Sequence, residues 1–472
     1  MRMRGECCAC VLACLALSGL ARGQAAVSPR WSKPADWVPA RWPWSAAASL
    51  DLIAAGPINC LLLRPVTAEF AAAAASRGLA TLAVVVPSDD VLATARRALS
   101  AKVTGIALEG DFPDDVAAAV RQISGGAPVV ELAPRSRMLA NSAAPVLATY
   151  QGVWPGMAEM ERLKAGPSGS VWIDTNTGFI RAARSWSDLP LWIANRPPAK
   201  TVVSTGRYLQ AIADAGMSGA RWVLALDDDF AARLASRDPK ALADWARMLA
   251  LAGYFERHPE WREMREYGKL ALVQDPAKGG LLSGGILDMI AVKQTPVRPI
   301  PRQRLTPGSL KDASMAVNLD AASLTPEEQA VLHDFTRSGG TLLTGPPGWT
   351  DQPPAGDKIT LDRLELERLN DIWREVNSMV GRRNLGVRLF NAASMLSNFL
   401  ISGDGRTAVL SLVNYSDYPV ENVSVHFLGD YKRAALLTPD GVEKPLELYK
   451  TDDGWGADID KVTVCATVRL EQ

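Results

Sequence analysis

The sequence predicts an α/β fold: a (β/α)8 TIM barrel followed by a Rossmann-like α/β domain and a C-terminal antiparallel β-sandwich. Three observations lead to this prediction. Apolar runs of strand length alternate with Ala-rich helical stretches through the first half of the chain. A shorter strand–helix pattern follows, and from residue 387 onward the apolar residues recur with a period of two. A chain of 472 residues is long enough for two or three domains.

Eight apolar runs, each short for a helix, are predicted to form the barrel strands, because parallel strands require helical crossovers such as those predicted between them. They are residues 59–63, 79–86, 103–108, 128–132, 146–149, 170–173, 190–194 and 220–226. The last run leads directly into Asp227, Asp228 and Asp229, at the end of a strand where such barrels place their active sites. The fourth and fifth helices are weakly defined, so seven or eight units are predicted. An unusually long doubly wound sheet is the alternative.

The N-terminal segments differ in composition from the barrel region of residues 49–265. Within residues 1–25, Arg2 and Arg4 precede the apolar run 7–20, which is typical of a signal peptide, so a secreted or periplasmic protein is expected. No second apolar segment is long enough to span a bilayer, so no membrane contact is expected after signal cleavage. Residues 26–48 are rich in Pro and Trp and are predicted to be an extended lead-in that packs on the barrel.

The second half of the chain divides into an α/β part and a β part. Residues 266–350 are predicted to form the Rossmann-like domain, with strands at 269–274, 314–319 and 340–345 and helices at 281–290 and 325–337. The latter helix should begin with a capping box, since Thr325 is followed by Pro326 and Glu328. Residues 351–386 are assigned to a linker and a helix, and residues 387–472 to the sandwich.

The composition argues against several classes of function. Lys plus Arg (51) equals Asp plus Glu (51), so no nucleic-acid partner is expected. Four of the six cysteines lie in residues 7–14, and Cys60 and Cys465 with three histidines cannot build a disulfide framework or a Cys/His metal cluster. Whether those two cysteines pair is open. The glycines of residues 279–285 lack dinucleotide-binding spacing, so no cofactor is expected.

The middle domain carries the most specific resemblance to known proteins. Leu-Thr-Pro-Glu-Glu at 324–328 and Phe-Thr-Arg-Ser-Gly-Gly-Thr-Leu-Leu-Thr-Gly at 335–345 resemble the amidotransferase-like middle domain of multidomain TIM-barrel glycoside hydrolases with a bacterial β-galactosidase-like layout. The resemblance implies a carbohydrate substrate or ligand. An amidotransferase needs a nucleophilic Cys with a His. Residues 268–350 hold no Cys and only His333, so the domain is expected to be non-catalytic and to serve structure or homo-oligomer formation.

Glycoside hydrolysis needs two carboxyl groups beside the scissile bond, so carboxylates at predicted strand ends are the catalytic candidates. They are Glu109, Glu131, Asp174 and Asp227. In the main clan of barrel glycosidases, the acid/base follows strand four, which ends here in Glu131. The nucleophile follows strand seven, which here continues into Ala194-Asn195-Arg196 without a carboxylate. Asp174, after the sixth predicted strand, is the alternative partner.

Each candidate also has a structural explanation. Glu109 can form a salt bridge to an adjacent loop, and Glu131 can pair with Arg135. Asp174 can cap a helix, while Asp228 or Asp229 is expected to cap the helix that begins with residues 230–234 and Asp227 to face the site. The candidate substrate-binding residues are Asp111, Trp154, Asn176 and Asn195.

Two hypotheses of function therefore remain. The first is an exported enzyme that acts on a poly- or oligosaccharide by paired-carboxylate acid/base chemistry. The second is a barrel that has lost catalysis and serves carbohydrate binding or assembly. The missing strand-seven carboxylate favours the second, whereas the strand-end carboxylates and the export signal favour the first.

Overall fold

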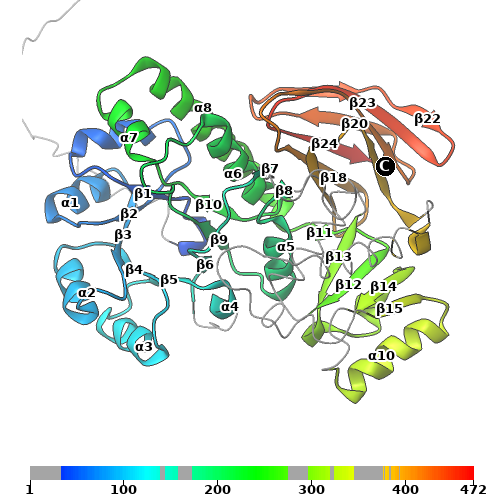
Figure 1. Ribbon diagram of the computed structural model, residues 1–472, viewed down its shortest axis with the longest axis horizontal. Coiled ribbons are helices and arrows are strands. Elements are labelled where there is room, and N and C mark those ends of the chain that lie inside the picture. The colour runs from blue at the N-terminus through cyan, green and yellow to red at the C-terminus, as the bar shows by residue number, and fades with distance from the viewer. Residues whose placement is uncertain are drawn as a thin grey trace, which may run out of the picture.

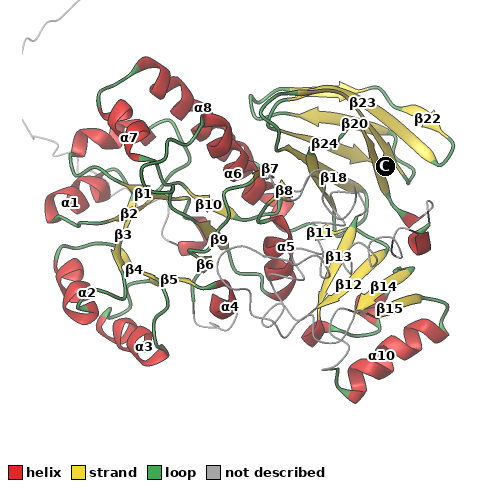
Figure 2. Cartoon of the chain, in the orientation of Figure 1, coloured by secondary structure: helices red, strands yellow, loops and turns green. Residues whose placement is uncertain are grey.

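The computed structural model describes residues 33–138, 144–157, 173–274, 296–318, 324–344, 376, 378–381, 384–392 and 394–472. The chain forms three parts (Figure 1). A barrel with outer helices lies at the N-terminal end, a smaller α/β part follows, and the C-terminal strands form two layers beside both (Figure 2). The predicted order of barrel, α/β domain and antiparallel sandwich is confirmed.

An eight-stranded parallel sheet forms the barrel, in the order β1-β2-β3-β4-β5-β6-β9-β10. A parallel bridge between Ala40 and Leu224 joins the first strand to the last and nearly closes the sheet. The strands are β1 (Pro39–Trp42), β2 (Cys60–Leu63), β3 (Ala80–Val85), β4 (Gly105–Glu109), β5 (Val129–Ala133), β6 (Leu147–Thr149), β9 (Leu191–Ala194) and β10 (Arg221–Val223).

Two of the predicted assignments in this region are wrong. The first barrel strand, β1, lies within residues 26–48, which we expected to be a lead-in. In place of the sixth strand predicted at 170–173, the sheet pairs β6 directly with β9. The described end of that run belongs to β8 (Ile173–Asp174), which pairs antiparallel with β7 (Gly156–Met157) in a separate ribbon. Strand β1 was missed because Pro39 and Arg41 interrupt its apolar pattern. The count of eight is right, but Glu109 now ends the fourth strand.

Helices cover the outside of the barrel, as expected from parallel crossovers. They are α1 (Ala68–Ser76), α2 (Val91–Ser100), α3 (Asp114–Ile123), α4 (Arg135–Met138), α5 (Thr177–Trp186), α6 (Thr205–Met217), α7 (Asp228–Ala235) and α8 (Pro239–Glu256). Side chains of Thr67, Asp90 and Ser204 cap the first turns of α1, α2 and α6. Such caps satisfy amide groups that a helix start leaves without partners.

The middle part is a four-stranded parallel sheet in the order β13-β12-β14-β15. Its strands are β12 (Leu270–Gln274), β13 (Val297–Pro301), β14 (Met315–Asn318) and β15 (Thr341–Thr344). The helix α10 (Pro326–Arg337) connects the last two and begins with the predicted Thr325–Glu328 capping box. The helix predicted at 281–290 lies outside the described residues.

Two antiparallel sheets form the sandwich. The six-stranded sheet has the order β11-β17-β18-β24-β20-β21 and contains β11 (Arg265–Glu266), β17 (Met395–Ile401), β18 (Thr407–Asn414), β20 (Arg433–Leu437), β21 (Glu443–Leu446) and β24 (Cys465–Glu471). The four-stranded sheet has the order β16-β19-β23-β22 and contains β16 (Val387–Phe390), β19 (Val420–Phe427), β22 (Tyr449–Thr451) and β23 (Gly454–Val462).

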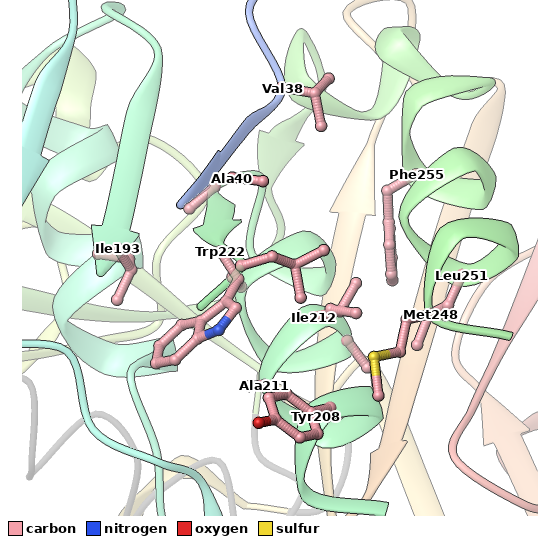
Figure 3. Close-up of a cluster of buried hydrophobic side chains, with 14 of the residues drawn as sticks. Val38, Ala40, Ile193, Tyr208, Ala211, Ile212, Trp222, Met248, Leu251 and Phe255 are labelled. Carbon is pink, nitrogen blue, oxygen red and sulfur yellow. The ribbon is translucent and has the colours of Figure 1, made fainter. Parts of the chain in front are cut away.

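The barrel and the six-stranded sheet share one apolar core. Helix α6 packs on β10 and α8 packs on α6, through residues labelled in Figure 3 that include Tyr208, Trp222 and Phe255. The same cluster continues into Leu400 and Val413 of the sandwich. Burial of this continuous surface holds the two parts together. None of the described helices is both long enough and apolar enough to cross a lipid bilayer.

Candidate functional site at the barrel mouth

The carboxyl ends of the barrel strands surround a cavity of about 540 Å³. Strand β1 contributes Arg41, the segment after β9 contributes Arg196, and the segment after β10 contributes Asp227. Parallel barrels place their functional groups at this end. The further charged lining residues are Arg64, Lys200, Asp228 and Asp229.

Glu109 lies between two arginines at this mouth. Arg41 donates to its carboxylate with Nη1 and Nη2, at 2.6 and 2.8 Å. Arg196 donates with Nε and Nη2, at 3.2 and 3.0 Å. The Glu109 side chain is 12% exposed, and it is not among the cavity-lining residues, whereas both arginines are. Glu109 therefore orients the two guanidinium groups that face the cavity.

These contacts decide the charge of Glu109. Burial by itself raises the pKa of this carboxyl group, but the hydrogen bonds and charges of Arg41 and Arg196 together outweigh it, so the pKa is lowered. A general acid needs the opposite shift, since it must hold its proton at working pH. Glu109 is thus ionised and suited to hold a cation, or to act as a base or nucleophile.

Glu131 does not reach the mouth. Val130 and Leu132, its neighbours on β5, belong to the cluster inside the barrel, so Glu131 points outward between them. Its carboxylate pairs with Arg121 of α3 rather than with Arg135. The prediction of a catalytic role for Glu131 is therefore not supported, because sequence position alone did not give the direction of its side chain.

Asp227 is the cap of α7, the role that we expected of Asp228 or Asp229. Its Oδ1 accepts from the Phe230 amide at 2.9 Å, and its Oδ2 accepts from the Val203 amide at 3.1 Å and the Tyr208 hydroxyl at 2.8 Å. With 4% of its surface exposed, Asp227 lines the cavity as a fixed acceptor. Asp228 and Asp229 are the exposed carboxylates of the lining.

Asn176, a predicted sugar ligand, is instead fully buried. Its amide side chain accepts from Arg135 and donates to Asp214 of α6, at 3.0 and 2.9 Å. Asp214 also accepts from Thr177 and, across the domain boundary, from Tyr415 of the sandwich. Asn176 therefore belongs to a buried structural network. The neighbouring Asp174 lies on β8, outside the barrel sheet, and its side chain is not among those described.

The other predicted substrate ligands lie around the mouth with partners of their own. The exposed Asp111 pairs with Arg137 at 2.5 Å. Asn195 donates to the Gly152 carbonyl at 2.6 Å. The ring of Trp154 packs edge-on against Tyr208 and Trp222, with centroids 5.4 and 5.1 Å away. Trp154 also donates to the Arg196 carbonyl at 3.2 Å, so it supports the segment that carries Arg196.

Our sequence interpretation missed the arginines of the site. Arg41 alternates with Ala40 and Trp42, which belong to the outer core, and this period of two indicates a strand with one inward charge. Arg196 follows the seventh strand directly, where we looked only for a carboxylate. Among the described residues, no group of three or more His, Cys, Asp or Glu side chains has the arrangement of a metal site. The thiols of Cys60 and Cys465 are separate and buried.

Comparisons with solved structures find proteins of similar fold. The chain is similar to alpha-L-fucosidase isoenzyme 2 from Paenibacillus thiaminolyticus, with a TM-score of 0.53 and 10% identity over 90% of this chain and 95% of that one. It also matches an apo exo-carrageenase GH42 from Bacteroides ovatus, with a TM-score of 0.42 and 8% identity over 75% of this chain and 54% of that one. A rhamnosidase from Novosphingobium sp. PP1Y matches with a TM-score of 0.43 and 13% identity, over 76% of this chain and 38% of that one.

The likeness to the fucosidase shows a shared fold and nothing finer, because 10% identity carries no residue-level correspondence. No protein-family model and no curated protein sequence matches the chain. Within this barrel, the position after strand four belongs to Glu109 and not to Glu131. The position after strand seven belongs to Asn195 and Arg196.

Proposed function

We propose that the protein is a glycoside-hydrolase-like barrel that binds a neutral saccharide at its mouth. The main observation behind this proposal is that Glu109 holds Arg41 and Arg196 in place, an arrangement that we call the arginine clamp. The two guanidinium groups present fixed hydrogen-bond donors to the cavity, where a glycosidase would have a pair of free carboxyl groups. Fixed donors and acceptors at the wall of a cavity are the usual means of orienting a polar ligand.

The balance of charges in the lining supports a neutral ligand. Four basic residues, Arg41, Arg64, Arg196 and Lys200, face three acidic ones, Asp227 to Asp229. Several of these charges are already paired, Arg64 with Asp89 and Asp229 with Arg233. Because the lining has no large excess of positive or negative charge, it favours a ligand with hydroxyl groups, which both donate and accept hydrogen bonds, over a strongly charged ligand.

Calorimetric titration of the mature chain with neutral oligosaccharides tests the proposal. We expect Arg196→Met to weaken binding roughly 10- to 100-fold, because a hydrogen bond from a charged group contributes about 1.5–3 kcal/mol. Arg433→Met is the matched control, since Arg433 is a 76% exposed side chain of the sandwich. Equal affinities in wild type and Arg196→Met, or binding of polyanionic saccharides alone, would contradict the proposal.

Hydrolysis is the second candidate, and one observation favours it. Glu109 ends β4 at the carboxyl end of the barrel, and its two arginine partners lower its pKa, so it has the charge of a base or nucleophile. Asp228 lines the cavity at the same end, and no hydrogen bond or ion pair is described for it, so its carboxyl group is the candidate for the second carboxyl group that hydrolysis requires. Release of reducing sugar by the wild type, abolished in both Glu109→Gln and Asp228→Asn, would establish this activity. Absence of release from a broad panel of glycans would reject it.

We also propose that the protein is exported and that its middle domain is structural. Export rests on the charged and apolar pattern of residues 1–25, which lie outside the described part of the chain. N-terminal sequencing of the native protein, with fractionation of the cells, would show whether that segment is removed. A structural or oligomeric role for the middle domain rests on the lack of cysteine in residues 268–350. Analytical ultracentrifugation would show whether the chain self-associates.

A further inference from the structure

The outer face of the four-stranded sheet carries aromatic rings that the barrel site does not use. Along β16 and β19, the side chains of Val387, Leu389, Val423 and Val425 belong to the sandwich core or pack against it. The alternate residues therefore point away from the core. They include Phe390 and His426, which join Tyr449 of β22 in a contiguous aromatic group. In Figure 1, β22 and β23 lie on the side of the sandwich far from the barrel.

Tyr449 lies against the sheet because Gly456 is opposite it. The two residues are register partners on β22 and β23. A Cβ atom added at Gly456 would meet the Tyr449 ring at 2.4 Å, so the ring occupies the space that any other residue would need. Tyr449 remains 37% exposed and Phe390 41% exposed. Both rings thus present surface to solvent, and the position of Tyr449 depends on the glycine beneath it.

Hydrogen-bonding groups surround these rings. The Tyr449 hydroxyl donates to Asp458 at 3.0 Å, and Ser424 donates to the same carboxylate oxygen at 2.7 Å. Arg388 lies over the Phe390 ring at 5.3 Å and pairs with Asp453 at 3.2 Å. A cavity of about 260 Å³ lies beside His426 and is lined by Arg388, Thr451, Asp452 and Asp453.

We propose that this surface, formed by Phe390, His426, Tyr449 and Asp458, is a second binding site for a neutral saccharide chain. The polarised C–H groups of a sugar ring complement the negative face of an aromatic ring, and its hydroxyl groups can donate to the carboxylates at the edge. The carboxylates Asp452, Asp453 and Asp458 disfavour an anionic ligand. The small apolar area between charged residues also differs from the larger apolar core of a typical protein interface.

The site is independent of the barrel mouth, because it lies on the four-stranded sheet, and the barrel packs on the other sheet of the sandwich. A protein with both sites would hold one saccharide chain on the sandwich while the barrel mouth engages another part of it, or another chain. Two such contacts raise the overall affinity for a polymer above that for a short oligosaccharide.

Affinity electrophoresis of the full mature chain tests the proposal, with gels that contain xyloglucan, galactomannan, laminarin or hydroxyethyl cellulose. We expect retardation by at least one of these neutral polysaccharides. Tyr449→Ala and Phe390→Ala should each weaken it about ten-fold, the effect of losing one aromatic contact and its buried surface. Tyr418→Ala is the matched control, because Tyr418 is 64% exposed and lies outside this surface.

Gly456→Ala tests whether the position of the Tyr449 ring matters for binding. It removes no aromatic or polar group but forces the Tyr449 ring from its place, so it should also weaken retardation. Retardation that is unchanged in Tyr449→Ala and Gly456→Ala but lost in Arg196→Met would contradict the proposed site on the sandwich. It would still support saccharide binding at the barrel mouth. Retardation that is lost in Tyr449→Ala and Gly456→Ala but unchanged in Arg196→Met would support the site on the sandwich and contradict saccharide binding at the barrel mouth.

Three other results would overturn the inference. One is the absence of retardation by all four neutral polysaccharides. Another is retardation by polygalacturonate alone, which would indicate an anion site. The third is a dimer in analytical ultracentrifugation that Tyr449→Ala converts to a monomer without any effect on retardation, since a second copy of the chain would then cover the rings.

Discussion

Glu109 and Glu131 show why a strand-end carboxylate cannot be assigned from its neighbours in sequence. Each follows or interrupts an apolar run, yet Glu109 points to the barrel mouth and Glu131 points to α3. Successive side chains of a strand point to opposite faces of the sheet, and the two glutamates occupy positions that face in opposite directions. Both acidic groups have arginine partners, but only the partners of Glu109 line the cavity.

The ion pairs of Glu109 should appear in the pH dependence of stability. Its pKa is lower in the folded protein than the ordinary value of 4.5, so it contributes stability above that value, and the contribution is lost as pH falls through the lower folded pKa. In urea unfolding between about pH 6 and pH 3, we expect Glu109→Gln to lose less stability than the wild type. An identical pH dependence in the two proteins would show that the clamp is not formed.

Asp227 makes a second prediction at this scale. Asp227→Ala removes the cap of α7 and leaves the Tyr208 hydroxyl and the Val203 amide without their acceptor. We expect a loss of about 2–4 kcal/mol in the free energy of unfolding, since a lost cap and buried unpaired groups add their costs. Asp228→Ala, at the adjacent exposed position, should change stability by less than about 0.5 kcal/mol. Similar losses in both variants would mean that the cap is misassigned.

Among the elements, α6 contacts both the barrel and the sandwich. One side carries Tyr208 against Trp154 and Phe230 near the mouth. Its buried Asp214 accepts from Asn176 and from Tyr415 of the sandwich. A carboxylate buried in this way is tolerated because hydroxyl and amide groups around it donate to both of its oxygens. The helix therefore connects the residues that lie near the barrel mouth to the C-terminal domain.

Tyr415→Phe tests this coupling. The substitution keeps the ring and removes the hydroxyl that donates to Asp214 at 2.7 Å. We expect a loss of about 1–3 kcal/mol in the free energy of unfolding, as for other hydrogen bonds to a buried charge. Tyr418→Phe, at an exposed tyrosine three residues away, should have no measurable effect. A double-mutant cycle with Asp214→Asn should show strong coupling, and additive losses would argue against the bond.

For the whole molecule, the shared core makes the barrel and the sandwich one folding unit. The apolar cluster that contains Tyr208 and Trp222 extends into Leu400 and Val413, whereas the middle domain has a separate cluster around Val273 and Leu332. Cooperative units of unfolding follow such contiguous cores.

Scanning calorimetry should therefore resolve two transitions. Leu332→Ala is expected to lower only the transition of the middle domain, because it opens a cavity in that core alone. Phe255→Ala should lower the other, larger transition. If Phe255→Ala were to separate the barrel from the sandwich into distinct transitions, or if Leu332→Ala shifted every transition equally, this division would be wrong.

The order of the three domains could be predicted from the sequence, because hydrophobic period and length reflect local backbone geometry. The sequence also predicted the Thr325 capping box, which depends on residues within one helical turn. It failed at β1, where Pro39 and Arg41 mask a strand that is stabilised by pairing with Cys60–Leu63 and by the Ala40–Leu224 bridge.

Which of the candidate residues share a site depends on contacts between segments far apart in the sequence. Glu109 meets Arg41 and Arg196 across 68 and 87 residues of sequence, and no local pattern encodes those distances. Asn176 is a predicted sugar ligand by sequence, but in the folded protein it is fully buried beside Asp214. The direction of a side chain, and what lies opposite it, follow from closing the barrel and packing the sandwich against it.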